Sequence, residues 1–326
     1  MPNGAEPRRA LDDVDRAIIG MLREDGRTTS RAIGAAIGLA ETNVTARIRA
    51  LLGSEALAIT TVFDWERVGY RHDLWLKIRA DGDPAPLSRT IAGMKGVHAV
   101  LRLTDPYDLL VHVLVPEQDG VGDFLSSQLA GTAGLGEVET AVTVRTIEYA
   151  VTLARLPVES SHFDFPDPAV ELDELDHATL SALTRDGRQS TRQIARDLGV
   201  NEGTIRARIR RMESAGMLRI CGQLNPLHTG PSASRAIIGV QTDVALGESV
   251  GRRAAKLPGI TMVAMVTGRH NLIIAAGFDD PTQMENSVRR LRCLPGVRGI
   301  EFSRILDVVA LDYHLARFVD PNETAD

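Results

Sequence analysis

The stretch that decides the fold is Leu11–Ala50, LDDVDRAIIGMLREDGRTTSRAIGAAIGLAETNVTARIRA, because the chain contains it twice. Its second occurrence is Leu172–Arg211, LDELDHATLSALTRDGRQSTRQIARDLGVNEGTIRARIRR. The two stretches align without a gap, and 16 of their 40 positions are identical. Solenoid repeats recur every 20–50 residues or so, whereas this repeat has an offset of 161 residues. Farther along, Gly96-Val97 matches Gly259-Ile260, so the 326-residue chain is predicted to be a duplication of one whole half.

Each half begins with a helical part. Apolar residues with helical spacing predict a first helix that Asp12 or Asp13 caps and Asp25-Gly26 ends. Two more helices are expected at 29–37 and 41–52, and the second half repeats the three at 175–183, 190–198 and 202–214. A helix, a short turn with glycine and a second helix form the arrangement that presents the second helix to the major groove of DNA.

The third helix of each half divides into an apolar face and a polar face. Val44, Ile48, Leu51 and Leu52 form the expected inward stripe of the first copy. Arginine can bond guanine through two N–H groups, asparagine can read adenine, and threonine can meet a phosphate or a thymine methyl group. The predicted DNA contacts are Thr42, Asn43, Thr45, Arg47 and Arg49 in the first copy, and Gly203, Thr204, Arg206, Arg208 and Arg210 in the second.

Two of these arginines are open to another interpretation. Arg47 and Arg208 fall next to the apolar stripe, so an ion pair with an acid of the same domain suits them as well as a phosphate contact does.

Basic charge gathers around the same helices. The chain as a whole is acidic, with 37 Lys and Arg against 43 Asp and Glu. Residues 27–50, however, hold four Arg against one Glu, and residues 188–211 hold seven Arg against one Asp and one Glu. In a single copy, an ordinary three-helix unit with a solvent-exposed arginine face would explain this charge pattern equally well. Its occurrence in both copies favours an anionic partner such as double-stranded DNA.

The second part of each half alternates strand and helix patterns. In the first half we expect, in order, strand 72–79, helix 86–94, strands 97–103 and 109–115, helix 122–129 and strand 138–147. In the second half the series is 235–242, 247–257, 260–266, 272–277, 281–292 and 297–308. The order βαββαβ is that of the ferredoxin-like fold, one antiparallel sheet with two helices on one face.

The two helical parts resemble the winged helix-turn-helix of the Lrp/AsnC (feast/famine) transcription regulators, in which a linker strand and a βαββαβ effector domain (RAM domain) follow. The resemblance covers nearly the whole chain, twice. Gly69-Tyr70 fits the pattern after the first wing, whereas LNPLHTGPSASRA, which follows the second, departs from it.

The resemblance implies an α+β chain in which two winged helix-turn-helix domains alternate with two ferredoxin-like effector domains. The expected ranges are 8–62 and 171–222 for the DNA-binding domains, 68–156 and 232–318 for the effector domains, and 157–170 for a proline-rich, acidic linker between the halves.

The family binds small ligands such as amino acids at a Thr-Gly-x-Tyr/Phe-Asp turn between the second and third strands of the effector domain. The first copy of this turn keeps the tyrosine and the aspartate but lacks the glycine, and the second keeps the glycine but has histidine and asparagine. A hairpin turn chosen for geometry alone remains the alternative. The expected effector contacts are Thr104, Asp105, Tyr107 and Asp108, and Thr267, Gly268, Arg269, His270 and Asn271.

The resemblance implies a cytoplasmic DNA-binding regulator that is not an enzyme and is modulated by a small molecule such as an amino acid, with no cofactor and no metal. Single-unit members dimerise through their effector sheets, so the fusion is expected to build that pair within one chain. Dimers or tetramers of the double-length chain are also expected.

Other classes of protein find little support. The start of the chain lacks the apolar stretch of a secretory signal, and no run approaches the roughly 18 apolar residues that cross a bilayer. Two cysteines, Cys221 and Cys293, are too few for a disulfide framework. No phosphate loop, dinucleotide fingerprint or nucleophile elbow occurs.

Two rival hypotheses remain. Fused siroheme decarboxylases are similar to these regulators in architecture, and His270 beside Arg269 is the pair that would suit the carboxylates of a tetrapyrrole. Alternatively, a regulator could bind DNA through the second copy only, because Asn201 is a good N-cap for its third helix and the matching Ala40 is a poor one.

Overall fold

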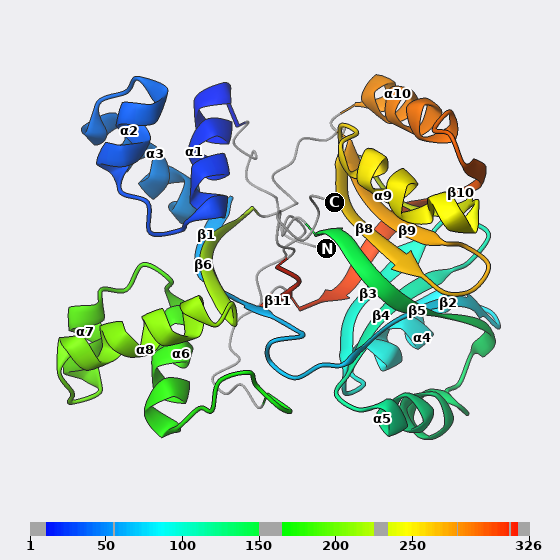
Figure 1. The fold of residues 1–326 in the computed structure, drawn as a ribbon, viewed down its shortest axis with the longest axis horizontal. Coiled ribbons are helices and arrows are strands. Elements are labelled where there is room, and N and C mark those ends of the chain that lie inside the picture. Colours follow the sequence, from blue (N-terminus) through cyan, green and yellow to red (C-terminus); the bar gives the residue numbers. More distant parts are fainter. Residues whose placement is uncertain are drawn as a thin grey trace, which may run out of the picture. The chain divides into compact units, whose positions relative to one another are not determined.

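The computed structural model describes residues 11–54, 56–149, 165–224, 234–278, 280–312 and 314–318. Their contacts divide the chain into two compact units, and each unit takes one part from each half of the sequence. The described residues up to Val68, those of 165–224 and those of 314–316 form the first, which we call the head unit. The remaining described residues form the effector unit (Figure 1). Most of the expected linker, 157–170, lies outside the described residues.

The head unit contains the predicted helices. The first head comprises α1 (Asp13–Glu24), α2 (Ser30–Ile37) and α3 (Glu41–Gly53), and the second comprises α6 (Glu174–Arg185), α7 (Thr191–Asp197) and α8 (Glu202–Ser214). Asp12 caps α1 and Thr29 caps α2 through their side chains. Asn201 accepts a hydrogen bond from the Gly203 backbone N at the start of α8, whereas Ala40 offers α3 no such bond, as the sequence predicts.

A small sheet joins the two heads. β1 (Leu57–Asp64) follows the first head and pairs antiparallel with β6 (Leu218–Leu224), which follows the second. A short third strand, β11 (Leu315–Ala316), pairs parallel with β1. The second effector domain was expected to run to residue 318, but β11 belongs to the head unit because its pairing partner lies there.

The Asp-Gly-Arg turn after the first helix of each head contacts the other copy. The Gly26 backbone N donates to the Ile220 carbonyl, and the Gly187 backbone N donates to the Ile59 carbonyl, at 2.8 and 2.9 Å. The Arg27 side chain donates to the carbonyls of Gly187 and Gln189, and Arg188 donates to that of Thr28. The repeated turn therefore holds the two heads together as a pair.

The effector unit contains two βαββαβ sets. The first is β2 (His72–Ala80), α4 (Pro84–Ala92), β3 (Val97–Leu103), β4 (Leu109–Val115), α5 (Gln118–Asp123) with the π-helical segment η1 (Phe124–Leu129), and β5 (Leu135–Tyr149). The second is β7 (Ser234–Thr242), the 3₁₀ turn η3 (Val244–Leu246), α9 (Gly247–Ala255), β8 (Ile260–Val266), β9 (Leu272–Phe278), α10 (Pro281–Arg292) and β10 (Val297–Leu311). Both sets have the predicted order.

The two sheets join at both edges into a closed barrel with the strand order β10-β3-β4-β2-β5-β8-β9-β7. At the junctions β5 pairs with β8 and β10 pairs with β3. The last strand of each half therefore pairs with the second strand of the other half. The pair of effector sheets expected from the duplication is thus built within one chain. β5 and β10 extend past the expected 147 and 308 because their last residues pair with β8 and β3, strands of the other half.

Side chains alternate between two sides of the barrel wall. On β2, Leu74, Leu76 and Ile78 pack in the apolar core beneath α4 and α5. Trp75 points the opposite way, into an apolar cluster where side chains of both halves meet. Lys77 lies on the same face of the strand as Trp75 and is 5% exposed. Eight strands enclose an interior about wide enough for side chains to fill, so this lysine is enclosed in the barrel.

Candidate DNA-binding site

The third helix of each head divides as predicted. Ile205, Ile209 and Met212 of α8 are buried, as are Val44 and Ile48 of α3. The expected contact residues lie on the other side, where Thr45 is half-buried and six are exposed: Thr42, Asn43, Arg49, Gly203, Thr204 and Arg206. Arg210 is exposed too. One expected position was wrong, since Leu52 is 37% exposed and the inward stripe of α3 ends at Leu51.

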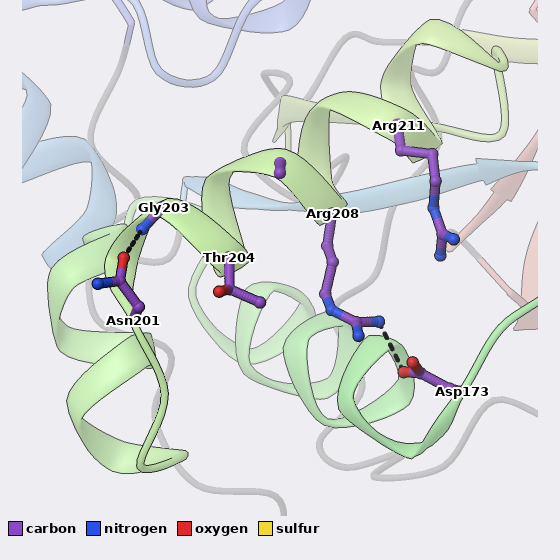
Figure 2. A pocket seen from close by; sticks show the side chains of 7 residues that line it. Asp173, Asn201, Gly203, Thr204, Arg208 and Arg211 are labelled. Atoms are coloured by element: carbon purple, nitrogen blue, oxygen red, sulfur yellow. Dashed lines mark hydrogen bonds and ion pairs between the residues drawn. The ribbon is translucent and has the colours of Figure 1, made fainter.

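Arg47 and Arg208 are paired with acids of their own heads. Arg47 Nη1 lies 2.7 Å from Asp12 Oδ2 and 2.9 Å from the buried Asp15 Oδ1. Arg208 Nη1 lies 2.7 Å from Asp173 Oδ1 (Figure 2) and 2.8 Å from Asp176 Oδ1. Of the two interpretations left open for these arginines, the internal ion pair is therefore observed, and a DNA contact by either remains a prediction.

The same ion pairs perturb the acids that cap the first helices. A hydrogen bond from the Asp176 backbone N, followed by the one from the Arg208 side chain, lowers the pKa of Asp173 below 3.8. In the first head the Asp15 backbone N and then Arg47 lower the pKa of Asp12 in the same way. Each pair thus joins the start of a head's first helix to its third helix.

An open depression of about 650 Å³ lies beside the first turns of α8. Its lining comprises Asp173, Asn201, Gly203, Thr204, Ala207, Arg208 and Arg211 (Figure 2). Arg211 bonds Asp176 Oδ2 at 2.6 Å. In the aligned positions of the first head, Asn201 is replaced by Ala40 and Arg211 by Ala50. The two heads therefore present different polar groups at corresponding places.

The remaining arginines differ in what holds them. Arg206 Nη2 lies 2.5 Å from Glu202 Oε1, which also accepts the Thr191 hydroxyl of α7. Within the part of the chain that the structure describes, neither Arg49 nor Arg210 has a carboxylate within ion-pair distance. Arg49 and Arg210 are thus the arginines of α3 and α8 whose charge is most available to a polyanion.

The expected effector turns use their polar side chains to hold the barrel together. The Thr104 hydroxyl oxygen accepts a hydrogen bond from the Arg304 backbone N, and that of Thr267 accepts one from the Val142 backbone N. Each threonine therefore bonds the last strand of the other half. Asp108 accepts from the Ala80 backbone N and Asn271 from the Thr242 backbone N, both at 2.8 Å. Asparagine serves here as well as aspartate because the contact needs only an acceptor oxygen.

The aromatic positions of these turns point into the barrel. Tyr107 and His270 are each 4% exposed. The Tyr107 hydroxyl donates to Glu139 Oε2 at 2.5 Å, and burial, followed by this hydrogen bond, raises the pKa of Tyr107 to about 12. His270 Nδ1 lies 2.7 Å from Lys77 Nζ, and burial, followed by the lysine charge, lowers the pKa of His270. Asp105, Gly268 and Arg269 are exposed at the two turns.

Two family models match the chain, each of them twice. The AsnC-type helix-turn-helix domain matches residues 11–52 and 172–213. The Lrp/AsnC ligand-binding domain matches residues 75–153 and 235–315. The chain belongs to the Lrp/AsnC family. It is a tandem duplication of the family's two-domain protomer.

Curated relatives of this Lrp/AsnC chain are single-length proteins. The chain is 32% identical over 146 residues to the uncharacterised HTH-type transcriptional regulator PH0140 of Pyrococcus horikoshii, covering 44% of this chain and 92% of the relative. It is 33% identical over 147 residues to PH1692 of the same organism, covering 45% and 99%. Among solved structures, the siroheme decarboxylase NirDL matches with a TM-score of 0.62 at 13% identity, over 92% of this chain and 93% of that chain. That likeness shows a shared fold.

Sequence reasoning about this Lrp/AsnC chain missed the acids that hold the arginines. Asp15 and Asp176 are both 1% exposed. A signal existed, because each acid and its arginine recur at the same spacing in both copies, Asp15 with Arg47 and Asp176 with Arg208. Among the described residues we find no cluster of three or more potential metal-ligating side chains, and no helix with the length and apolarity that a membrane span requires.

Proposed function

We propose that this DNA-binding transcriptional regulator reads an asymmetric operator with both heads and that its effector unit responds to a small molecule such as an amino acid. The family assignment carries the DNA-binding function itself. The observation that carries the asymmetric operator is the difference between the exposed faces of α3 and α8. Thr42, Asn43 and Thr45 correspond to Gly203, Thr204 and Arg206, so the two heads offer different donors to base edges.

The small sheet of the head unit supports joint binding by both heads. The β1–β6 pairing and the Asp-Gly-Arg contacts fix the heads to each other in one unit. We therefore expect two unlike half-sites at a constant spacing of about one helical turn of DNA, or a multiple of it. Selection of bound sequences from random DNA tests this expectation. A single half-site, or a footprint of that length, would instead favour the hypothesis of one active head.

Arg49 and Arg210 supply the sharpest test of the surface. If Arg49 and Arg210 each contact a phosphate, R49A and R210A should each weaken operator binding and reduce the slope of log K against log[salt] by about one. If one of them contacts a base, its loss should weaken binding by roughly 1–3 kcal/mol and relax specificity at one position of the operator. R89A is the matched control, because Arg89 is an exposed arginine of α4 in the effector unit. Operator affinities of R49A and R210A equal to that of R89A would contradict the proposed surface.

The effector proposal rests on the ligand-binding domains of the family. Asp105, Gly268 and Arg269 are the turn residues exposed for a ligand, whereas Thr104, Thr267, Asp108 and Asn271 already hold the turns. A panel of amino acids added during operator selection tests the proposal, since an effector changes the yield or the bound sequences. Light scattering with and without the same panel tests the expected dimer or tetramer of the double-length chain.

An enzymatic function related to siroheme is the less supported alternative. His270 is buried against Lys77, and Arg269 Nη1 lies 3.7 Å from Glu301 Oε2. Of the pair that suggested recognition of tetrapyrrole carboxylates, His270 is therefore held inside the barrel, and only Arg269 is exposed at the turn. We expect no spectral shift when siroheme is mixed with the protein, and a saturable shift would reverse the assignment.

A further inference from the structure

One lysine lies inside the barrel where the two halves of the chain meet. Lys77 Nζ lies 2.7 Å from His270 Nδ1, 3.4 Å from Glu139 Oε1 and 3.5 Å from Glu301 Oε1. Glu139 belongs to the same half as Lys77, whereas His270 and Glu301 belong to the other. Because an ion removed from water is stable only when it is paired and hydrogen-bonded, this lysine depends on groups from both halves.

The surroundings of this lysine follow the duplication except at one position. The strand register places Lys77 opposite Glu139 in the first half and Gly239 opposite Glu301 in the second. The two glutamates are therefore equivalent, and so are Tyr107 and His270 of the effector turns. Lysine in one half thus corresponds to glycine in the other.

The glycine is required by its neighbour. A Cβ atom at Gly239 would lie 2.9 Å from both Cγ and Cδ2 of the His270 ring, which is closer than a Cβ atom approaches a nonbonded atom in folded proteins. In the first half the ammonium of Lys77 lies 5.3 Å from the centre of the Tyr107 ring. Each half therefore carries a matched set of two residues. The set of the first half is Lys77 with Tyr107, and that of the second half is Gly239 with His270.

We propose that these matched sets make the first effector sheet pair with the second and not with another copy of itself. In the mixed pair, one ammonium lies between two carboxylates and donates a hydrogen bond to the His270 ring of the opposite half. In a pair of two first halves, two ammonium groups would extend into the same space, and each would meet a phenol that is already bonded to its own glutamate. In a pair of two second halves, two carboxylates would face each other without a lysine.

The preference matters because a duplicated chain has alternatives to closing on itself. If each half paired with the same half of a different neighbouring chain, the chains would join end to end into open strings. The single lysine disfavours both same-half contacts. The sheet edges are then used up within the barrel, and the partner that the first sheet accepts is the unlike half.

Full-length exchange variants test the proposal. G239K/H270Y gives both halves the lysine–tyrosine set, and K77G/Y107H gives both the glycine–histidine set. The exchanged chain K77G/Y107H/G239K/H270Y again has one lysine between two glutamates, placed in the other half. We expect the unfolding midpoint of each same-set chain to fall by about 5–10 °C and that of the exchanged chain to recover at least half of the loss. A same-set chain as stable as the parent, or an exchanged chain as unstable as the same-set chains, would overturn the proposal.

A charge-free chain separates pairing preference from stability. K77M/E139Q/E301Q keeps side chains of similar size and removes the three charges. We expect it to fold but to form species larger than the parent in light scattering over a range of concentrations, because its halves are no longer distinguished by charge. If it keeps the parent's mass at every concentration, the lysine does not select the partner and the proposal is wrong.

Discussion

A methyl group added at Gly187 should weaken the contact that holds the two heads together. Gly187 lies in the turn after α6, and its backbone N donates to the Ile59 carbonyl of β1. A Cβ atom there would lie 2.9 Å from Ile220 Cγ2, 3.0 Å from the Ile59 carbonyl oxygen and 3.1 Å from its carbon. Gly187 is not among the glycines with positive φ, so alanine is otherwise compatible with its backbone. The cost of G187A therefore comes from the close approach alone.

The size of the effect follows from which atoms must move. The Ile220 methyl group can rotate away, but the Ile59 atoms are backbone in the centre of the β1–β6 pairing. Overpacking of this kind costs typically 1–3 kcal/mol, and the backbone contacts place G187A in the upper half of that range, at about 2–3 kcal/mol. For a unit of this size that free energy corresponds to a fall of roughly 8–12 °C in the unfolding midpoint.

Calorimetry of the full chain measures this shift, and G20A is the matched control. Gly20 lies within α1, and a Cβ atom there meets nothing within 4 Å. Alanine at this position should stabilise the helix by about 0.5–1 kcal/mol. G187A should also loosen the constant half-site spacing in operator selections. If G187A unfolds at the parent's temperature, or if G20A destabilises as much, the contact between the heads does not have the role assigned to it.

Two further predictions concern the head unit. The pKa of Asp173 is lowered by the Asp176 backbone N–H and then by Arg208, so its carboxylate stabilises the fold above about pH 3.8, and this contribution is lost as the pH falls below that value. D173N keeps a capping oxygen but removes the charge, so it should flatten the acid side of a plot of stability against pH; an unchanged acid side would contradict the ion pair. Asn201 caps α8, whereas Ala40 leaves α3 uncapped. N201A should therefore lower the free energy of unfolding in urea by about 0.5–2 kcal/mol, and A40N should raise it by a similar or smaller amount. A change of the same sign in both variants would contradict the assigned caps.

The elements could be predicted because the local signals agreed with the fold. The range of α8 is identical to the prediction, and so are those of β8 and α10. Helical spacing, capping residues and alternation each depend on neighbours in sequence, which the sequence displays directly. Larger deviations occur at the ends of the last strand of each half, β5 and β10. β5 and β10 extend past residues 147 and 308 because their last residues pair with the other half.

The site could be predicted only in part, for a related reason. The outward face of α8 follows from helical spacing, and its exposed residues are the expected ones. The environment of Lys77 could not be predicted, since its four neighbours come from strands and turns that meet only after both junctions of the barrel form. Likewise, the hydrogen bonds of Thr104 and Thr267 could not be predicted, because the backbone N–H groups that donate to their hydroxyl oxygens belong to the other half.

Duplication within one chain permits an asymmetry that two identical protomers cannot encode. In a symmetric dimer, any residue at a position facing the twofold axis occurs twice, so a lysine there always meets a second lysine. Here Lys77 and Gly239 occupy equivalent positions, and a chain that carries both halves can keep that difference, whereas two identical protomers cannot. The same freedom applies to the heads, where Thr45 corresponds to Arg206 and Ala50 to Arg211. Since both units differ between their halves, the asymmetric barrel and the asymmetric operator that we propose have one cause, the loss of the constraint that both halves be identical.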